Sequence, residues 1–428
     1  MAAQTIPLDG EPLCGVEGPE TPFPTPADDG VLRVAQYNVL HSETDDGDQS
    51  LAPRLPLLVD VMVASGADIV GLEEVTRNLE LEPADEYPQK HGLVAQRLAD
   101  LMAQRTGEPW SWCWSLSNPH VPLTPDEFVG GGNPLDQQAA QMGNFPDEGD
   151  FSEGLAILSR FPISESVFRR LLPRSYETVG CVDLDPFCPL DAIFDSRQVL
   201  FGRVETPGGG LDFFVTHLAH HLTELSTTTQ TLQAQQIVGI IDEFVTADTT
   251  TPDVLVGDLN SVPGSEAIGA VMAAGYVDAW SAFGGAECVQ AGDGGCSGGP
   301  PAGEEVWTAS PSRAMSERID YVFVRPPAGC SLRIVDAARI GEASVPDGER
   351  GMLWPSDHDG FVVQPACAAA AAAPSSPAAG GVGAGGSVDA GGRLPATGGG
   401  ALRVWPLLGG LGAWVLTRLV RRRPHGLH

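Results

Sequence analysis

The strongest constraint on the fold is a series of short apolar runs, rich in β-branched and aromatic residues, that alternates with helix-like segments. Gly, Pro, Asp or Asn bounds each run, which is typical of strands. The strand-like runs lie at 31–40, 68–75, 155–159, 211–218, 253–260 and 318–325. Helix-like spacing of apolar residues occupies 51–65, 91–104, 229–245 and 264–275. Because neither a repeat nor an interdomain linker interrupts this alternation, we predict a single α/β domain over residues 31–366.

Polar side chains stand at the ends of several of these buried runs. Taken singly, each is best explained as a structural residue that satisfies a hydrogen bond. Taken together, they supply amides, carboxylates and two imidazoles, the groups that hold a hard, oxygen-ligated metal ion beside acid/base catalysts. The set comprises Asn38, Glu74, His217, Asp258, Asn260, Asp320, Asp357 and His358.

The charge balance argues against one class of function. Acidic residues number 56 against 24 basic ones, which gives a net charge of −32. Such a charge repels polyanions and anionic lipid surfaces, so a broad DNA-binding surface built from Lys and Arg is not expected. A small phosphate site remains compatible with this charge, because a bound divalent cation reverses the local field.

Seven segments resemble, in order, the motifs of the endonuclease/exonuclease/phosphatase superfamily. They are YN at 37–38, LEEV at 72–75, ILSRFPI at 157–163, THL at 216–218, GDLNSVP at 257–263, RIDY at 318–321 and SDH at 356–358. The resemblance covers nearly all of residues 31–365. It implies a four-layer α/β/β/α sandwich of the DNase I type, in which two packed sheets lie between helices. The site is then expected where the strand ends of both sheets converge.

The resemblance also implies a Mg²⁺-dependent phosphodiesterase, with Mn²⁺ and Ca²⁺ as alternative ions. Glu74 matches the metal-binding glutamate, and Asn38 and Asp357 are expected to assist it. Family members often have Gln-Glu where this chain has Glu73-Glu74. The extra carboxylate of Glu73 either tightens metal binding or is solvated and inert, and we favour the inert interpretation.

The same resemblance assigns catalytic roles. Asp258 matches the residue that orients or deprotonates the attacking water, and Asn260 matches the one that contacts the phosphate. His358 is expected to donate to a phosphoryl oxygen or to the leaving group, while Asp320 holds its imidazole and raises its pKa. His217 matches the second histidine of DNase I-like and sphingomyelinase-like members.

Other polar and aromatic residues leave two interpretations open. Arg197, in DSRQVLF, either contacts phosphate or forms a surface salt bridge. His220 and His221 are expected to be solvated rather than catalytic. The tryptophans of the segment 110–114 alternate as in a strand, so we favour packing in the core over a platform on which bases stack.

Eight cysteines are present, and two pairs of them are close in sequence. Cys181 and Cys188 form one pair, and Cys288 and Cys296 form the other, inside a polar insertion at 284–304. In an exported protein such pairs in Gly/Pro/Asp-rich loops are typical of loop-closing disulfides; otherwise they are free thiols. No CxxC occurs and no histidine lies at zinc spacing, which argues against a zinc site. The pairing of the remaining cysteines stays open.

The carboxyl end resembles a cell-wall sorting signal of Gram-positive bacteria. A linker rich in Ala and Gly at 367–393 precedes the signal at 394–428. Within the signal, LPATG at 394–398 is followed by an apolar run and an arginine-rich tail. The resemblance implies that a sortase cleaves between Thr397 and Gly398 and joins the protein to peptidoglycan. The run, at 404–417, is shorter than the roughly 20 residues of a full membrane span.

The amino-terminal segment does not fit export directly. Residues 1–30 are polar and contain no apolar stretch after a basic one, as a signal peptide requires. We therefore expect that the true start lies upstream and that the protein is secreted and anchored to the wall.

The sequence narrows the class of substrate only in part. The resemblance favours an extracellular nuclease or general phosphodiesterase acting on nucleic acid, because RIDY at 318–321 differs from the Trp-Cys-Asp-Arg type of inositol phosphatases. A sphingomyelinase-like enzyme acting on phospholipid is the first alternative. A surface-binding protein that keeps the scaffold without catalysis is the second. No stable protein partner is implied.

Overall fold

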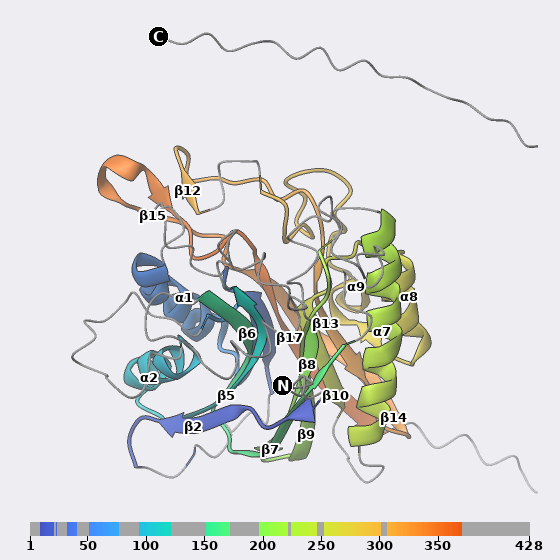
Figure 1. Cartoon of the computed structure of the whole chain (residues 1–428). Coiled ribbons are helices and arrows are strands. Elements are labelled where there is room, and N and C mark those ends of the chain that lie inside the picture. The colour runs from blue at the N-terminus through green and yellow to red at the C-terminus, as the bar shows by residue number, and fades with distance from the viewer. Residues whose placement is uncertain are drawn as a thin grey trace, which may run out of the picture. The chain divides into compact units, whose positions relative to one another are not determined.

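Two mixed sheets pack face to face, with helices on both outer faces (Figure 1). The computed structural model describes residues 9–20, 23, 32–40, 51–76, 94–120, 151–171, 197–220, 224–245, 252–300 and 306–369. The chain divides into a unit of residues 1–371 and a unit of residues 372–428. The second unit, which holds the predicted sorting signal, lies outside the described residues, as does most of the polar segment 1–30. No helix within the described ranges is long and apolar enough to cross a membrane.

The first sheet has the strand order β1-β7-β8-β9-β10-β13-β11. Its strands are β1 (Asp9–Gly10), β7 (Ile163–Arg170), β8 (Gln198–Thr206), β9 (Gly209–His217), β10 (Asp253–Asp258), β11 (Val277–Asp278) and β13 (Asp320–Arg325). Strands β9 and β10 run parallel, and the other neighbours are antiparallel.

The second sheet has the order β14-β17-β3-β4-β6-β5-β2. Its strands are β2 (Leu13–Glu17), β3 (Val34–Asn38), β4 (Ile69–Glu73), β5 (Trp110–His120), β6 (Phe151–Ser159), β14 (Cys330–Ile340) and β17 (Gly360–Ala369). Here β3 and β4 are the parallel pair. A small third sheet joins β12 (Trp307–Thr308), β16 (Met352–Leu353) and β15 (Val345–Pro346), and the 3₁₀ turn Gly348–Arg350 lies between the last two.

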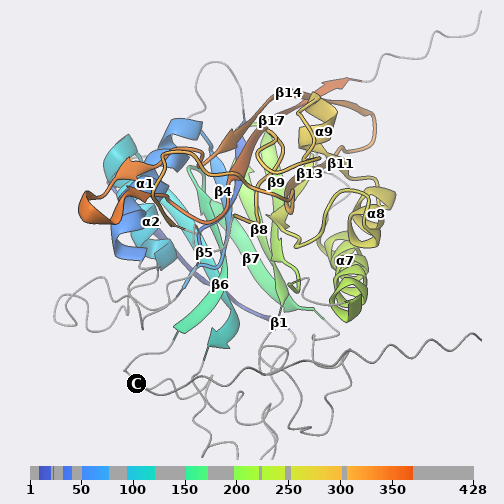
Figure 2. The same ribbon diagram turned by 90° about the horizontal axis from the view of Figure 1, so that it is seen from above.

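Helices cover the outer face of each large sheet, as the view from above shows (Figure 2). Helices α1 (Leu51–Ser65) and α2 (Val94–Thr106) pack on the sheet that contains β3 and β4. Helices α7 (Glu224–Phe244) and α8 (Glu266–Ala273) pack on the sheet that contains β9 and β10. The short helix α9 (Ala279–Phe283) contacts β13 and β14. The four-layer α/β/β/α sandwich predicted from the sequence is therefore confirmed.

Strand β9 shows how the sequence produces these layers. Side chains alternate between the two faces of a strand, so Phe213 and Val215 enter the core between the sheets while Phe214 enters the core beneath α7. A strand covered on both faces is continuously apolar, which is why it can be recognised from the sequence. The sheets approach each other closely at Gly71, where an added Cβ would lie 2.3 Å from Val256 Cγ2.

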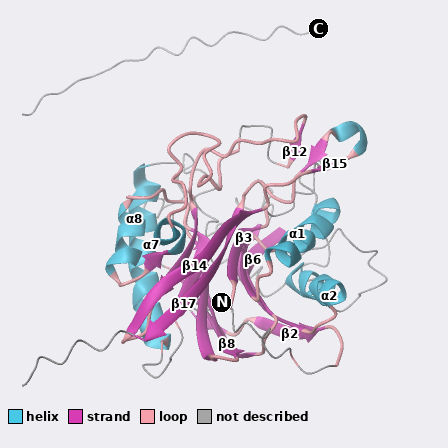
Figure 3. Ribbon diagram, turned by 180° about the vertical axis from the view of Figure 1, so that it is seen from behind, coloured by secondary structure: helices cyan, strands magenta, loops and turns pink. Residues whose placement is uncertain are grey.

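The antiparallel pair of β14 and β17 was not predicted from the sequence. Its long strands are seen from behind in Figure 3. Strand β14 alternates half-buried and exposed residues over most of its length, because one face meets water. Charged residues such as Arg333 and Asp336 break its apolar run, so periodicity alone does not reveal it. Strand β5 likewise extends to His120, beyond the tryptophan segment 110–114 that was predicted to form a strand.

Candidate metal and phosphoester site

The predicted site residues converge because both parallel strand pairs end at the same edge of the sandwich. Asn38 ends β3, and Glu74 directly follows β4. In the other sheet, Asp258 ends β10 and is the register partner of both His217 on β9 and Asp320 on β13. Parallel strands carry their carboxyl ends to one edge. Residues far apart in the sequence are thereby brought together.

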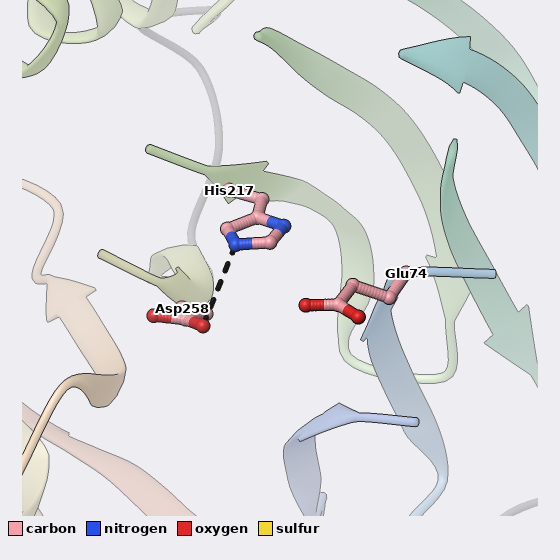
Figure 4. Close-up of side chains that lie close together, drawn as sticks. All are labelled: Glu74, His217 and Asp258. Carbon is pink, nitrogen blue, oxygen red and sulfur yellow. Dashed lines mark ion pairs between the residues drawn. The ribbon is translucent and has the colours of Figure 1, made fainter. Parts of the chain in front are cut away.

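One group of ligand atoms belongs to Glu74, His217 and Asp258, which lie within 4.8 Å of one another and point toward a common space (Figure 4). Asn38 links two of them, since its Nδ2 donates to Glu74 Oε1 at 2.9 Å and to Asp258 Oδ2 at 3.2 Å. The Asn38 Oδ1 atom accepts from the backbone N–H of Leu40. The half-buried carboxylate of Glu74 and the buried carboxylate of Asp258, both held by one amide, are a donor set that suits a hard divalent cation.

A second group shares Asp258 with Asp320 and His358. His358 Nδ1 lies 2.9 Å from Asp320 Oδ2, and His358 Nε2 lies 3.7 Å from Asp258 Oδ2. Burial opposes protonation of this imidazole, but Asp320 and Asp357 outweigh it and hold the pKa of His358 well above its ordinary value. The Nε2–H of His358 is therefore available at neutral pH as a proton donor that faces the common space.

His217 has the opposite electrostatic character. Burial and the nearby charge of Arg197 lower the pKa of His217 to about 3. Asn260 Nδ2 lies 3.0 Å from His217 Nε2 and also donates to the Leu218 carbonyl oxygen, so Nε2 of His217 is the acceptor. The two histidines thus differ: His217 is neutral and His358 is protonated.

Backbone strain is concentrated at the same edge. Only three non-glycine residues in the described ranges have positive φ, namely Leu40 at 56°, Glu74 at 57° and Asn260 at 47°. Each follows the end of a strand that contributes to the site. Such conformations cost about 1–3 kcal/mol each and persist where the surrounding structure imposes them, which is common at functional sites.

The comparison with protein families agrees with this geometry. Residues 35–358 match the model of the Endonuclease/Exonuclease/phosphatase family.

The chain belongs to this family.

Solved structures of similar fold are found at low sequence identity. An endonuclease/exonuclease/phosphatase from Beutenbergia cavernae is 21% identical with a TM-score of 0.47, covering 80% of this chain and 73% of that one. A mannosyl-6-phosphatase from Bacteroides thetaiotaomicron is 16% identical with a TM-score of 0.47, covering 78% of this chain and 99% of that one. The D. rerio TDP2 structure with a single-strand DNA product is 16% identical with a TM-score of 0.45, covering 78% and 98%. No curated protein matches the sequence.

As a member of the endonuclease/exonuclease/phosphatase family, the chain carries a metal-dependent phosphoester-hydrolase fold. Among the predicted ligands, Asp357 belongs to neither group of close ligand atoms. Its Oδ1 lies 4.0 Å from His358 Nε2, at the margin of the site. Burial raises the pKa of Asp357.

The prediction that Glu73 is solvated is wrong, because its side chain lies inside the protein next to the site. Its side chain is fully buried, and Gln36 Nε2 donates to Glu73 Oε2 at 2.7 Å. The same Gln36 nitrogen donates to Asp320 Oδ1 at 2.7 Å. Burial and the charge of Asp320 raise the pKa of Glu73 well above its ordinary value. Glu73 ends a strand covered on both faces, so its side chain cannot reach water.

The alternative that Arg197 forms a surface salt bridge is wrong, because the side chain is buried. Its Nη1 lies 3.7 Å from Glu153 Oε1, and both side chains are buried. Since the charge of Arg197 lowers the pKa of His217, the guanidinium lies near the site. His220 is exposed, as expected, whereas His221 lies outside the described residues. The tryptophans of β5 belong to the core beneath α1 and α2.

Two residues that support the site were missed. Arg54 on α1 is fully buried and donates to the carbonyl oxygens of Val39, Leu40 and Pro355. Ser356 Oγ donates to the Asn38 carbonyl oxygen at 2.7 Å. These bonds join the end of β3 to the loop that carries Asp357 and His358. Nothing in the sequence distinguishes Arg54 from a solvated arginine on an amphipathic helix.

Three of the disulfides lie among the described residues, and they join Cys14 to Cys113, Cys288 to Cys296 and Cys330 to Cys367. The pairing predicted for Cys288 and Cys296 is therefore confirmed. The other predicted pair, Cys181 with Cys188, lies outside the described residues.

The metal-free protein is expected to lose stability as the pH rises from about 5 to about 7, between the unfolded and the folded pKa values of its raised carboxyls. Burial raises the pKa of Asp258 to about 7 and that of Asp359 to about 6, above the values of the unfolded chain. A raised pKa means that the folded state binds more protons, so this stability is lost as the pH passes through the folded pKa. The raised pKa of His358 acts in the same direction. His217, whose pKa is lowered to about 3, opposes the trend below about pH 6.5, but it is one group against several raised carboxyls.

Thermal unfolding in EDTA at stepped pH measures this dependence. Asp258→Asn should flatten the decline in Tm, and saturating Mg²⁺ should also flatten it because the ion favours the ionised carboxylates. A Tm that rises over this pH interval would show that the pKa values of these carboxyls are not raised in the folded protein.

Proposed function

We propose that the protein is an exported, Mg²⁺-dependent phosphodiesterase that cleaves nucleic acid or another phosphodiester outside the cell. The observation that supports this most strongly is the position of Asp258. Its Oδ2 lies 3.5 Å from Nε2 of the neutral His217 and 3.7 Å from Nε2 of the protonated His358, beside Glu74. A carboxylate next to a donor imidazole can hold a water and accept its proton, while the donor protonates the leaving oxygen.

The residues fit a divalent cation. Glu74 and Asp258 are the carboxylates that would hold it, and Asn38 aligns both of them through one amide nitrogen. Bound there, Mg²⁺ would withdraw charge from a phosphoryl oxygen and from the leaving group. Burial, together with the charge of Asp320, raises the pKa of Asp258 to about 7, and this carboxyl therefore shifts to the ionised form once a cation is bound.

The remaining residues act on the phosphate and its protons. Asp258 orients the attacking water, and its Oδ1 is fixed by the backbone N–H of Asn260 at 2.8 Å. His358 donates from Nε2 to a phosphoryl oxygen or to the leaving group, while Asp320 keeps its Nδ1 protonated. Arg197 supplies positive charge beside His217 for a non-bridging phosphate oxygen.

A panel assay of the purified protein tests the proposal. Plasmid DNA, RNA, sphingomyelin, bis-p-nitrophenyl phosphate and the monoester p-nitrophenyl phosphate are compared with Mg²⁺ and with EDTA. Cleavage of DNA or RNA with Mg²⁺ and not with EDTA supports the nuclease. Cleavage of sphingomyelin alone would indicate a sphingomyelinase-like enzyme in place of the nuclease. Cleavage of the monoester alone would indicate a phosphatase. If none of the substrates is hydrolysed, the result would favour the alternative of a surface-binding protein without catalysis.

Binding of Mg²⁺ should also stabilise the fold, through Glu74. A ligand at 100 times its Kd adds about 2.7 kcal/mol to the free energy of unfolding. We expect a rise in Tm on addition of Mg²⁺ to the wild type and no rise in Glu74→Gln. Differential scanning calorimetry measures both. Glu243→Gln, on the exposed surface of α7, is the matched control and should keep the full shift. An equal rise in Glu74→Gln would place the ion elsewhere.

Export and wall anchoring are part of the same proposal. The order of LPATG, apolar run and arginine tail supports cleavage between Thr397 and Gly398 by a sortase. The disulfides also support it, since such bonds persist in oxidising surroundings. Mass spectrometry of muramidase-released wall material should find a peptide that ends at Thr397 joined to a peptidoglycan fragment. Recovery of a peptide that continues through Gly398 would contradict it.

A further inference from the structure

The backbone segment Cys296–Gly298, here called the strap, lies across the Asp320–His358 pair. Ser297 Oγ accepts hydrogen bonds from the backbone N–H of Asp320 at 3.2 Å and of Ile319 at 3.3 Å. The Ser297 carbonyl oxygen accepts from the backbone N–H of Asp359 at 2.7 Å. Ser297 is fully buried. One residue therefore holds the backbone beside both members of the pair.

The strap also lies beside the imidazole. A Cβ added to Gly298 would lie 3.4 Å from His358 Cε1 and 2.6 Å from Ile319 Cδ1. Gly298 is thus next to the ring of His358, and Ile319 leaves no room for a side chain there. A shift of the strap would move both the hydrogen bonds to Asp320 and the backbone beside His358.

Hydrogen bonds hold the downstream side of the strap. The backbone N–H groups of Ser297 and Gly298 donate to the Glu317 carbonyl oxygen at 2.7 and 3.0 Å. Arg339 Nη1 donates to the Cys296 carbonyl oxygen at 2.7 Å. These bonds fix the segment against the start of β13, which carries Asp320.

The upstream side is held by the Cys288–Cys296 disulfide, which closes a short loop with a sequence separation of 8. The loop contains Gly292, Gly294 and Gly295, and glycine gains more conformational freedom than other residues when it is released. Because Cys296 directly precedes Ser297, the disulfide limits how far the strap can move.

We propose that Ser297 is a positioning residue for the Asp320–His358 pair and that the Cys288–Cys296 disulfide keeps it in place, so that full activity requires this disulfide. The inference rests on the proposed role of His358 as proton donor. It differs from a general stabilising role of disulfides in a way that can be measured. Stabilisation by a cross-link grows with the loop that it closes. The Cys330–Cys367 bond, with a separation of 37, should therefore contribute at least as much stability as Cys288–Cys296.

The test compares four variants of the full chain: C288S/C296S, C330S/C367S, Ser297→Ala and Ser316→Ala. Ser316 is the matched control for Ser297, because its hydroxyl donates to the Gly299 carbonyl oxygen on the exposed side of the same segment. For each variant, kcat and KM are measured on an oligonucleotide DNA substrate with Mg²⁺, and Tm is measured by thermal unfolding. Proton NMR follows the downfield signal of the His358 Nδ1–H in its hydrogen bond to Asp320.

We expect C288S/C296S and Ser297→Ala to lower kcat by about 10-fold with little change in KM, because a displaced catalytic group slows the chemical step. The His358 signal should shift or broaden in both. C330S/C367S should lose at least as much Tm as C288S/C296S while keeping kcat, and Ser316→Ala should keep both kcat and the signal.

Two results would overturn the proposal: an equal loss of kcat in C330S/C367S, or an unchanged kcat and His358 signal in Ser297→Ala. If Ser297→Ala does not fold, C288S/C296S against C330S/C367S decides the question. An inactive wild type would refute the proposed function instead. The NMR signal would still show whether the strap positions His358.

Discussion

Replacing His358 with alanine is expected to lower kcat for Mg²⁺-dependent phosphodiester hydrolysis by about 10³-fold, within the range usual for a general acid or base. The imidazole is the only cationic side chain that the structure places within 4.0 Å of Asp258 in the described ranges. Its Nδ1 is committed to Asp320, so only Nε2 can deliver a proton to the phosphate or the leaving group. Without it, the leaving oxygen departs unprotonated. Steady-state kinetics on an oligonucleotide DNA substrate measure the loss, because its alkoxide leaving group needs the proton, whereas p-nitrophenolate departs without one.

Asp258→Ala should produce a loss of similar size, since the attacking water is then neither held nor deprotonated. Circular dichroism checks that both variants remain folded. Asp258→Ala removes one of several buried like charges, whereas His358→Ala removes the cation that faces Asp320 and Asp258, so thermal unfolding of this variant is measured as well. His220→Ala is the matched control, since His220 lies just after β9, the strand that carries His217, but is exposed, and this variant should keep full activity. If both His358→Ala and Asp258→Ala keep more than about a tenth of the wild-type kcat, the mechanism is wrong.

Much of this site could be predicted because catalytic groups violate the pattern of their own strands. A carboxylate, amide or imidazole that closes a buried run costs free energy unless it is paired or used, so it stands out in the sequence. Asn38, His217 and Asp258 were found in this way, and the structure brings them together. The layers of the fold were predictable for a related reason, since strands covered on both faces are continuously apolar.

The supporting residues could not be found by the same reasoning. Glu73 was expected to be solvated because the sequence does not show which segments cover the end of β4. Ser297 lies in a polar insertion that resembles any surface loop, and only its contacts with Asp320 and Asp359 reveal its role. Whether a polar side chain is buried depends on packing between distant segments, and local composition does not record that packing.

Among the supporting residues that the sequence did not reveal, Arg54 should contribute most to the stability of the fold. We expect Arg54→Met to lower the free energy of unfolding by about 3–5 kcal/mol, because three carbonyl oxygens lose this donor at a cost of about 1–3 kcal/mol each. Burial lowers the pKa of Arg54 to about 10, so the guanidinium is still charged at neutral pH. Methionine fills much of the volume but leaves the carbonyl oxygens of Val39, Leu40 and Pro355 without this donor. Urea unfolding measures the change.

The matched control is Arg105→Met on α2, whose salt bridge to Asp60 is about half exposed on both sides, at 54% and 53%. An exposed pair contributes about 0–1 kcal/mol, so this variant should unfold close to the wild type. Arg54→Lys should not restore stability, because one ammonium group cannot reproduce the planar fork that reaches three carbonyl oxygens. Since those oxygens belong to the segments that carry Asn38 and His358, kcat should fall together with stability in Arg54→Met. A variant that unfolds like the wild type would show that the two segments hold each other without Arg54, through bonds such as that from Ser356 Oγ to the Asn38 carbonyl oxygen.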